Sequence, residues 1–370
     1  MFRLLLSFLG IEIPSARMWR ELDLMLLGLL FALVGFGFVT LYGASPEYAA
    51  RQMRWIAIGV VTMLLLLFAS EMALAKAAPF FYGVALLLLI YVLSTPEIKG
   101  ARSWIRVGTF RFQPSEFTKI VVTLLVARLL SRFTPLREAK LWPGLGALVA
   151  VCAPPLGLIV IQPDLGTAFI FCLTIVSMMW AAQMPRRLLV AIVLWAILLG
   201  VVGYPHLKPY QKQRLTSFLN PERDPRQTGY QVIQARITQG SGRLFGKGWG
   251  QGTQTEYRFL PEFHNDFIFS SLGEQFGLVG SVACVALFFV FIARCYGAAR
   301  KTRNLFGAYA IVGLTTIVGA HTAINLGMSL GLLPVMGLPL PFFSYGGSFM
   351  LTNFAIVGLI LNLRMRRHLF

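Results

Sequence analysis

The chain has 370 residues, 56% of them hydrophobic and 13% charged, with a mean hydropathy of +0.70. This composition excludes an ordinary soluble domain and indicates a polytopic membrane protein. The formal net charge is +18, but aromatic residues are rarely interleaved with the basic ones, so nucleic acid is not expected as a partner. The four cysteines all fall in or at the ends of apolar segments and form no disulfide framework or metal-ligand pattern.

The first 23 residues precede the first long apolar segment. Their apolar run, Leu4 to Ile13, is interrupted by Glu12 and followed by Pro14, Arg17 and Arg20. We therefore predict an interfacial or cytoplasmic N-terminal stretch over 1–23 and no cleavable signal peptide.

Apolar windows of roughly 16 to 22 residues, long enough for a helix to cross about 30 Å of hydrocarbon, recur along the rest of the chain. They lie near 24–43, 54–70, 77–95, 117–133, 144–162, 166–183, 187–204, 267–293, 305–326 and 349–364. Because backbone exposed to lipid must satisfy its own hydrogen bonds, we predict an all-α fold, a bundle of about ten transmembrane helices. The bundle forms one integral domain over 1–370, with a large extracytoplasmic loop at 205–263 between helices 7 and 8.

The Lys and Arg residues of the short loops favour an orientation with both termini in the cytoplasm. One short outer loop departs from this rule because it is crowded with cations. These are Lys99, Arg102, Arg106 and Arg111. Together with cations of the long loop, such as Arg214 and Lys247, they predict an outward-facing basic basin that binds something anionic. Contact with lipid headgroups of the outer leaflet is the alternative.

The long loop holds two patterned stretches. In residues 229–238, Tyr230, Ile233 and Ile237 recur at helical spacing, which predicts a short amphipathic helix over the mouth of the bundle. Residues 240–252 are rich in glycine, which lets backbone amides approach a ligand closely, although a flexible turn is the favoured interpretation of this stretch taken alone. The stretch is not a nucleotide-binding P-loop, because Lys247 is followed by glycine.

Three acids, Glu262, Asp266 and Glu274, lie where the long loop turns into the eighth apolar segment. Ionisable groups at membrane depth are costly and normally serve a function. Asp266 is the first candidate for catalysis, and capping of the next helix is the alternative role.

Three further constellations carry polar chemistry. Glu116 and Lys119 are three residues apart at the start of a predicted helix and can form an ion pair, either structural or functional. Asp164 lies in a tight outer turn and either caps the next helix or serves the site. In the apolar but helix-breaking stretch 331–348, Ser344 and Tyr345 line a polar spot or satisfy broken helix ends.

These same stretches resemble the SEDS family, the shape, elongation, division and sporulation proteins, and most of all its rod-shape elongation branch. The resemblance runs from about Leu24 to the C terminus. It rests on the motifs GARSWI with RFQPSEFTKI, QPDLGTA, NPERDP with GYQVIQ, SGRLFGKGWGQGTQ, FLPEFHNDFIF and GLLPVMGLPLPFFSYGGS. Asn265 and Gln275 depart from the usual family residues without removing a candidate catalytic group.

The resemblance implies a peptidoglycan glycosyltransferase that polymerises lipid II into β-1,4 glycan strands, with Asp266 as the essential acid. In our hypothesis Asp266 accepts the proton of the acceptor 4-hydroxyl, while Arg102, Lys119 or Arg214, with or without Mg²⁺ or Mn²⁺, neutralises the departing pyrophosphate. The candidate substrate-binding residues are Arg102, Trp104, Glu116, Lys119, Asp164, Arg214, Lys247, Glu262, Ser344 and Tyr345.

The resemblance also implies partners and a location. The partners are a single-span class B penicillin-binding protein and other membrane proteins of the elongation complex. The location is the bacterial cytoplasmic membrane, with the active site facing the periplasm. Two alternatives stay open: a flippase or other transporter of lipid-linked sugars, and a membrane scaffold without catalysis that recruits a partner enzyme.

Overall fold

The computed structural model describes residues 12, 14–97, 101–108, 110–134, 141–223 and 228–366. Most of the predicted N-terminal stretch and Lys99 lie outside the described residues. The described part of that stretch includes the short helix α2 (Ala16–Arg20), which Ser15 caps by accepting a hydrogen bond from the Met18 amide. The helix directly precedes the first long helix.

Each of the ten apolar windows predicted from the sequence coincides with one long helix of the described chain. They are α3 (Leu24–Ala44), α4 (Pro46–Leu66), α5 (Glu71–Val92), α6 (Pro114–Phe133), α7 (Leu141–Ile161), α8 (Leu165–Ala181), α9 (Arg186–Gly203), α13 (Ile268–Lys301), α14 (Leu305–Ser329) and α15 (Gly347–Met365). Eight of these helices are long and apolar enough to cross a membrane. The other two are α8, which is shorter, and α6, which carries four charged residues.

Local sequence explains several helix starts. Asp23 caps α3 through the Leu26 amide at 3.1 Å, and Ser70 caps α5 through the Ala73 amide at 3.1 Å. Proline occupies the first turn of α4 and of α6, where its missing N–H costs no hydrogen bond. α4 begins eight residues before its apolar window, because polar first turns belong to the helix, and α13 continues eight residues beyond its window through a polar last turn.

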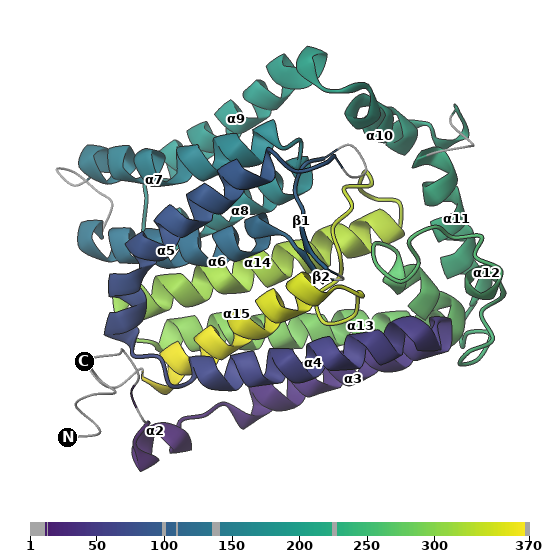
Figure 1. The fold of residues 1–370 in the computed structure, drawn as a ribbon, viewed down its shortest axis with the longest axis horizontal. Coiled ribbons are helices and arrows are strands. Elements are labelled where there is room, and N and C mark those ends of the chain that lie inside the picture. Colours follow the sequence, from purple (N-terminus) through teal and green to yellow (C-terminus); the bar gives the residue numbers. More distant parts are fainter. Residues whose placement is uncertain are drawn as a thin grey trace.

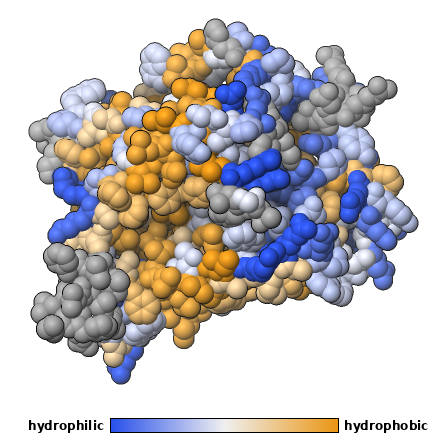
Figure 2. Space-filling model, in the orientation of Figure 1, coloured by the Kyte–Doolittle hydropathy of each residue, from blue (hydrophilic) through white to orange (hydrophobic). Residues whose placement is uncertain are grey.

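The helices run roughly parallel in Figure 1, with α14, α15 and α6 inside the bundle and α9 at its edge. The loops gather at one end, which we call the outer end: α10 (Pro209–Leu219), α11 (Thr228–Ser241) and α12 (Thr253–Glu256) lie there. The helix α2 and the last turn of α15 lie at the opposite end. Figure 2 shows apolar side chains over the flank of the bundle and hydrophilic ones gathered toward the outer end.

A small hairpin at the outer end was not predicted. Strand β1 (Ile105–Val107) pairs antiparallel with β2 (Phe110–Phe112), which places Arg106 directly opposite Arg111. Like charges directly opposite each other destabilise a strand pair. The hairpin therefore holds two of the outer loop's cations close together.

The helix α13 is interrupted at Gly277, whose backbone is non-helical with φ 67° and ψ −159°. The glycine-rich stretch 240–252 packs against this kink. A Cβ on Gly277 would lie 2.4 Å from the Gly246 nitrogen, and one on Gly246 would lie 2.1 Å from the Gln275 carbonyl oxygen. These two glycines therefore permit contact between two backbones of the same chain.

The predicted amphipathic helix of the long loop is confirmed as α11, but another of its faces is buried. Val232, Ala235 and Thr238 are buried, whereas Ile237 is 46% exposed. A Cβ on Gly273 of α13 would lie 2.7 Å from the Gln239 side chain, so glycine at 273 lets α11 approach α13 closely. Tyr230 and Ile233 are partly buried, so the apolar face predicted from the helical spacing lies only partly against the bundle.

Candidate active site

Asp266 lies at the outer end, in the turn just before α13. The N-cap position of α13 is Phe267, and no side chain caps the helix there, so Asp266 is not the capping residue that the alternative interpretation required. Its side chain is partly buried. A Cβ built on Gly337, which has φ +68°, would lie 3.6 Å from Asp266 Oδ2. Gly337 therefore lies next to the carboxylate, at a distance where even a Cβ would make only ordinary van der Waals contact.

The backbone around Asp266 is held by the irregular stretch between α14 and α15. Asn325 of α14, fully buried, donates from Nδ2 to the Asp266 carbonyl at 2.9 Å and to the Leu338 carbonyl at 2.8 Å. The Ser344 hydroxyl donates to the Asn265 carbonyl at 2.6 Å, and the Tyr345 amide donates to the His264 carbonyl at 2.9 Å. Three consecutive carbonyls, 264 to 266, are thus fixed from a segment about 60 to 80 residues away in the chain.

The first turns of α4 support the same turn from another side. The ring of Tyr48 stacks on His264 with centroids 4.0 Å apart and also approaches Tyr345 at 5.0 Å. Gln52, buried, donates to the Ser344 carbonyl at 2.9 Å. The backbone of Asp266 is consequently preorganised by α4, α14 and the stretch before α15.

A buried charged cluster lies one helical turn farther along α14. Lys119 Nζ lies 2.8 Å from Glu116 Oε1 and 2.6 Å from His321 Nε2, and all three side chains are buried. An ammonium group can only donate hydrogen bonds, so His321 Nε2 is the acceptor. The neutral imidazole ring therefore carries its proton on Nδ1. Four residues at about 1.5 Å each separate His321 from Asn325, so the residue that contacts Lys119 and the residue that holds the Asp266 carbonyl lie roughly 6 Å apart along the axis of α14.

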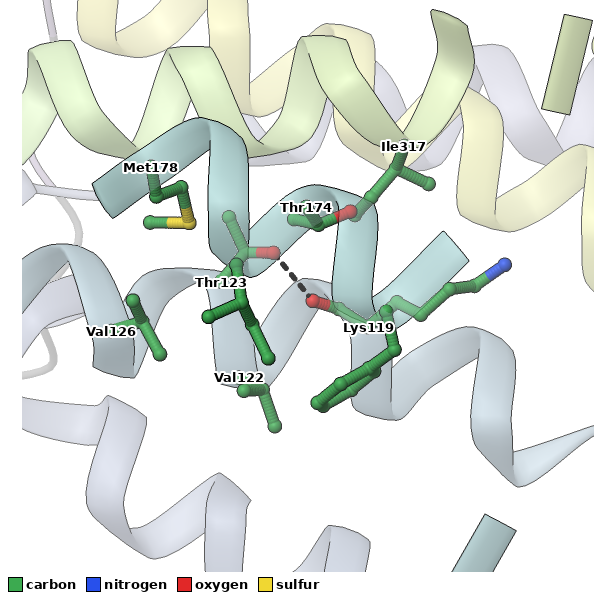
Figure 3. A pocket seen from close by; sticks show the side chains of 9 residues that line it. Lys119, Val122, Thr123, Val126, Thr174, Met178 and Ile317 are labelled. Carbon is green, nitrogen blue, oxygen red and sulfur yellow. Dashed lines mark hydrogen bonds between the residues drawn. The ribbon is translucent and has the colours of Figure 1, made fainter. Parts of the chain in front are cut away.

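Below Lys119 the space between α6, α8 and α14 is nearly filled. Figure 3 shows the Lys119 amine directed away from Val122, Val126 and Met178, while the Thr123 hydroxyl donates to the Lys119 carbonyl at 2.7 Å. The cavity there measures about 10 Å³, which is room for about one water molecule. This cavity is too small for a sugar.

The turn at Asp164 joins the site from the side of α8. Its carboxylate caps α8 by accepting from the Thr167 amide at 3.1 Å and hydroxyl at 2.9 Å, and it accepts from Gln113 at 3.0 Å. The helix-cap interpretation of Asp164 is therefore confirmed. Gln113 directly precedes α6, so this contact links Asp164 to the helix that carries Glu116 and Lys119.

The predicted cations of the basin are spread over the outer end. Arg102 is exposed and donates to the Leu93 carbonyl at 3.2 Å, and Trp104 is partly buried before β1. The Arg214 guanidinium lies 5.7 Å from the centre of the Tyr210 ring, above the turn that carries Asp164. Burial raises the pKa of Tyr210 above its ordinary value, and the Arg214 charge opposes this shift.

Two of the predicted substrate-binding side chains are engaged with the protein itself. Lys247 Nζ lies 2.7 Å from Glu274 Oε1, and Glu274 is fully buried. The Ser344 hydroxyl, also fully buried, accepts from the Leu340 amide at 2.8 Å while donating to Asn265. Ser344 thus satisfies backbone groups of the turn before α15 and of the Asp266 turn, and neither partner is a helix end. Binding of substrate by either residue stays a prediction.

Glu262 directly precedes Phe263 and the Asp266 turn and adopts a positive φ of 54°, which is uncommon for a residue other than glycine. Its carbonyl accepts from the Asn265 amide at 3.0 Å and from the Phe267 amide at 3.3 Å. The backbone of Glu262 therefore shapes the turn that presents Asp266.

No three His, Cys, Asp or Glu side chains of the described residues gather closely enough to hold a metal ion. Mg²⁺ is commonly bound by one or two carboxylates together with substrate phosphates. The protein alone does not supply a metal centre within the described ranges, so no catalytic step is assigned to one.

Sequence reasoning missed Asn325, Gln113, Gln52 and Tyr48 as supports of the site. A signal existed for Asn325, because it is a polar residue in an apolar segment. His321 is another polar residue in the same segment, and it contacts Lys119. The four-residue spacing of His321 and Asn325 already places both on one face of a helix.

The fold and the site together define a polytopic helical membrane protein with a preorganised acidic residue at one end of the bundle. Residues 16–369 match the profile of the cell cycle proteins FtsW, RodA and SpoVE. The chain belongs to this FtsW/RodA/SpoVE family.

Individual relatives are similar along nearly the whole chain. The peptidoglycan glycosyltransferase MrdB of Escherichia coli K12 is 37% identical over 352 residues, 94% of each protein. Stage V sporulation protein E of Bacillus subtilis is 34% identical and covers 92% of this chain and 96% of its own. A structure described as a peptidoglycan synthase complex that coordinates polymerisation and crosslinking matches with a TM-score of 0.81 and 32% identity, covering 94% of this chain and 98% of its own. The rod shape determining protein RodA of Thermus thermophilus matches with a TM-score of 0.71 and 30% identity, with the same coverage.

Proposed function

We propose that this protein is a peptidoglycan glycosyltransferase that polymerises lipid II into β-1,4 glycan strands, with Asp266 as the general base. The activity is supported by relatives such as the E. coli MrdB protein, which is a peptidoglycan glycosyltransferase by name and matches over 94% of both chains. Neither a transporter nor a scaffold without catalysis is favoured by a specific observation in the structure.

The chemistry needs two kinds of group. Transfer of a sugar from a pyrophosphate donor with inversion requires a base for the proton of the attacking hydroxyl and positive charge for the departing pyrophosphate. Pyrophosphate is already a good leaving group, so the two carboxylates of a glycoside hydrolase are not required. One carboxylate beside a cationic surface is sufficient.

The observation that supports Asp266 as this base is the way its backbone is held. Asn325 fixes the Asp266 carbonyl at 2.9 Å, and Ser344 and Tyr345 fix the two carbonyls before it. A catalytic group is effective when the surrounding protein holds it in the reactive geometry before the substrate arrives. Gly337, which carries no side chain, lies beside the carboxylate.

The positive charge is divided between an exposed and a buried set. Arg102 and Arg214 lie at the outer end and are the cations that a pyrophosphate reaches first. Lys119 is buried against Glu116 and His321, so we assign it to the interior of the site, where it sets the local charge beside the reacting groups. A divalent cation, Mg²⁺ or Mn²⁺, that enters with the pyrophosphate remains part of the proposal.

In the proposed arrangement the outer end faces the periplasm and both termini lie in the cytoplasm, in the orientation that the short-loop cations favour. A class B penicillin-binding protein is the proposed partner, together with other membrane proteins of an elongation complex. Support for a crosslinking partner comes from the similar structure of a synthase complex that coordinates polymerisation and crosslinking.

The direct test is polymerisation by the purified protein in proteoliposomes supplied with lipid II, with and without the partner. We expect labelled glycan strands that gel electrophoresis resolves by length and that lysozyme digests. A chelator added in a parallel reaction tests the divalent cation separately. Absence of strands under all conditions, with correctly folded protein and an active partner, contradicts the proposed function.

A further inference from the structure

A hollow of about 300 Å³ lies at the end of the bundle opposite Asp266, between α13 and α15. Its size is at the lower end of the range of about 300–1,000 Å³ that is typical of small-molecule sites. The hollow is lined by Phe289, Val290, Ala293, Arg294, Gly297, Ala298, Lys301 and Arg364. Asp266 and Arg294 are separated by 28 residues of mostly helical chain, roughly 40 Å at 1.5 Å per residue, so the hollow is independent of the proposed active site.

The lining of the hollow changes from apolar to cationic along α13. Phe289, 72% exposed, and Val290, 39% exposed, form the apolar part. Lys301 lies about 18 Å farther along the helix, twelve residues at 1.5 Å each, and Arg294 lies between them. An occupant that matches this gradient has an apolar tail at one end and an anionic group at the other.

The floor of the hollow is made of small residues. No atom outside the helix backbone lies within 4 Å of the position that a Cβ on Gly297 would take. Ala293, one turn earlier, also lines the hollow. A chain-like ligand can therefore lie against the backbone of α13 at this point.

The cations of the hollow exceed the carboxylates that neutralise them. Arg294 donates to Asp23 from Nε at 2.9 Å and from Nη2 at 3.1 Å, and Arg364 forms an ion pair with the same carboxylate. Two guanidinium groups thus share one carboxylate. Lys301 is exposed and forms no ion pair within the described ranges of the chain. Three positive charges against one negative charge leave a local excess of two.

We propose that this hollow binds an anionic phospholipid from the leaflet on the side of the chain termini, the cytoplasmic leaflet in the predicted orientation. The phosphate lies against Arg294 and Lys301, and an acyl chain follows α13 past Gly297 to Phe289. Basic pockets between transmembrane helices on the cytoplasmic side are a recurring form of lipid headgroup site. A lipid is favoured over a soluble anion because the apolar wall belongs to the same hollow as the cations.

The test is native mass spectrometry of the full-length protein with defined lipids, phosphatidylglycerol against phosphatidylcholine, and with glycerol phosphate as a soluble anion. Gly297→Leu fills the floor of the hollow, and Lys301→Gln removes an exposed charge. We expect the wild-type protein to retain phosphatidylglycerol. Lys301→Gln should lower the affinity about fivefold, the effect of one basic group near a lipid surface, and Gly297→Leu should lower it at least as much because its side chain occupies the space of the acyl chain.

Two matched variants serve as controls. Gly83→Leu adds the same side chain on α5, where the Cβ position is equally open, and Arg300→Gln removes a neighbouring exposed charge that does not line the hollow. Both should bind phosphatidylglycerol as the wild type does. The proposal is overturned if all four variants match the wild type, if phosphatidylcholine binds equally well, or if glycerol phosphate binds as tightly as the lipid.

Discussion

The ion pair of Lys247 and Glu274 allows a quantitative prediction about the glycine-rich stretch 240–252. The Glu274 side chain is 0% exposed and that of Lys247 is 26% exposed. Besides the ammonium at 2.7 Å, the carboxylate accepts from the Gln254 amide at 2.8 Å and from the Thr255 amide and hydroxyl at 3.2 and 2.8 Å. The pair therefore fastens the stretch to the first part of α13.

Lys247→Met leaves the Glu274 charge buried with neutral donors only. Removing one partner of a buried pair costs about 3–5 kcal/mol in unfolding free energy. Because Lys247 is partly exposed, we expect a loss at the lower end of this range, about 3 kcal/mol. Glu274→Gln replaces a charged acceptor and should cost about 1.5–3 kcal/mol. The double variant leaves no uncompensated buried charge, so it should fall short of the sum of the two single losses by about 1.5 kcal/mol or more.

The assay is reversible unfolding of the detergent-solubilised protein with rising mole fraction of sodium dodecyl sulfate. Lys208→Met, an exposed lysine of the same loop region, is the control and should change the free energy of unfolding by less than about 0.5 kcal/mol. The KM for lipid II should stay unchanged in folded Lys247→Met. Normal stability of this variant combined with a tenfold higher KM would refute the structural role and favour direct binding of substrate.

Three further substitutions test how the site is supported. Asn325→Leu leaves the carbonyls of Asp266 and Leu338 buried without their donor, so we expect a loss of about 1–3 kcal/mol in unfolding free energy and a larger relative loss of kcat; unchanged kcat would contradict the positioning role. His321→Phe keeps a ring but removes the acceptor of the Lys119 ammonium, and polymerisation by the folded fraction should fall at least tenfold, whereas His321→Gln should restore part of it. Gly277→Ala forces a Cβ against neighbouring backbone and should lower the thermal midpoint by several degrees, with an unchanged midpoint as the contrary result.

The sequence predicted the membrane bundle well because hydrocarbon thickness imposes a simple requirement on each helix. All ten apolar windows became helices, and the Glu116 and Lys119 pair followed from a three-residue spacing alone. The extension of α13 to Lys301 and its break at Gly277 were missed. A hydropathy pattern carries no information about the packing of stretch 240–252 against that break.

The parts of the site that could not be predicted depend on contacts between distant segments. Asn325 reaches Asp266 across 59 residues, and Gln52 reaches Ser344 across 292 residues. The spacing of residues within one segment does not predict which residue of a distant segment it contacts. Asp266 itself was found because a charge at the membrane boundary is costly wherever it lies in the fold. Its supports are neutral side chains, and of these only Asn325 stands out, as a polar residue in an apolar segment.

The central claim is that Asp266 accepts the proton of the attacking hydroxyl. The polymerisation rate of the Asp266→Asn variant tests this claim most directly. Purified Asp266→Asn is compared with the wild type and with Glu222→Gln, an amide substitution at an exposed carboxylate of the outer loop, at equal folded protein and saturating lipid II. Loss of a general base should slow polymerisation by about 10²–10⁴-fold, while Glu222→Gln retains the wild-type rate. A rate for Asp266→Asn within a few fold of the wild type would contradict the account.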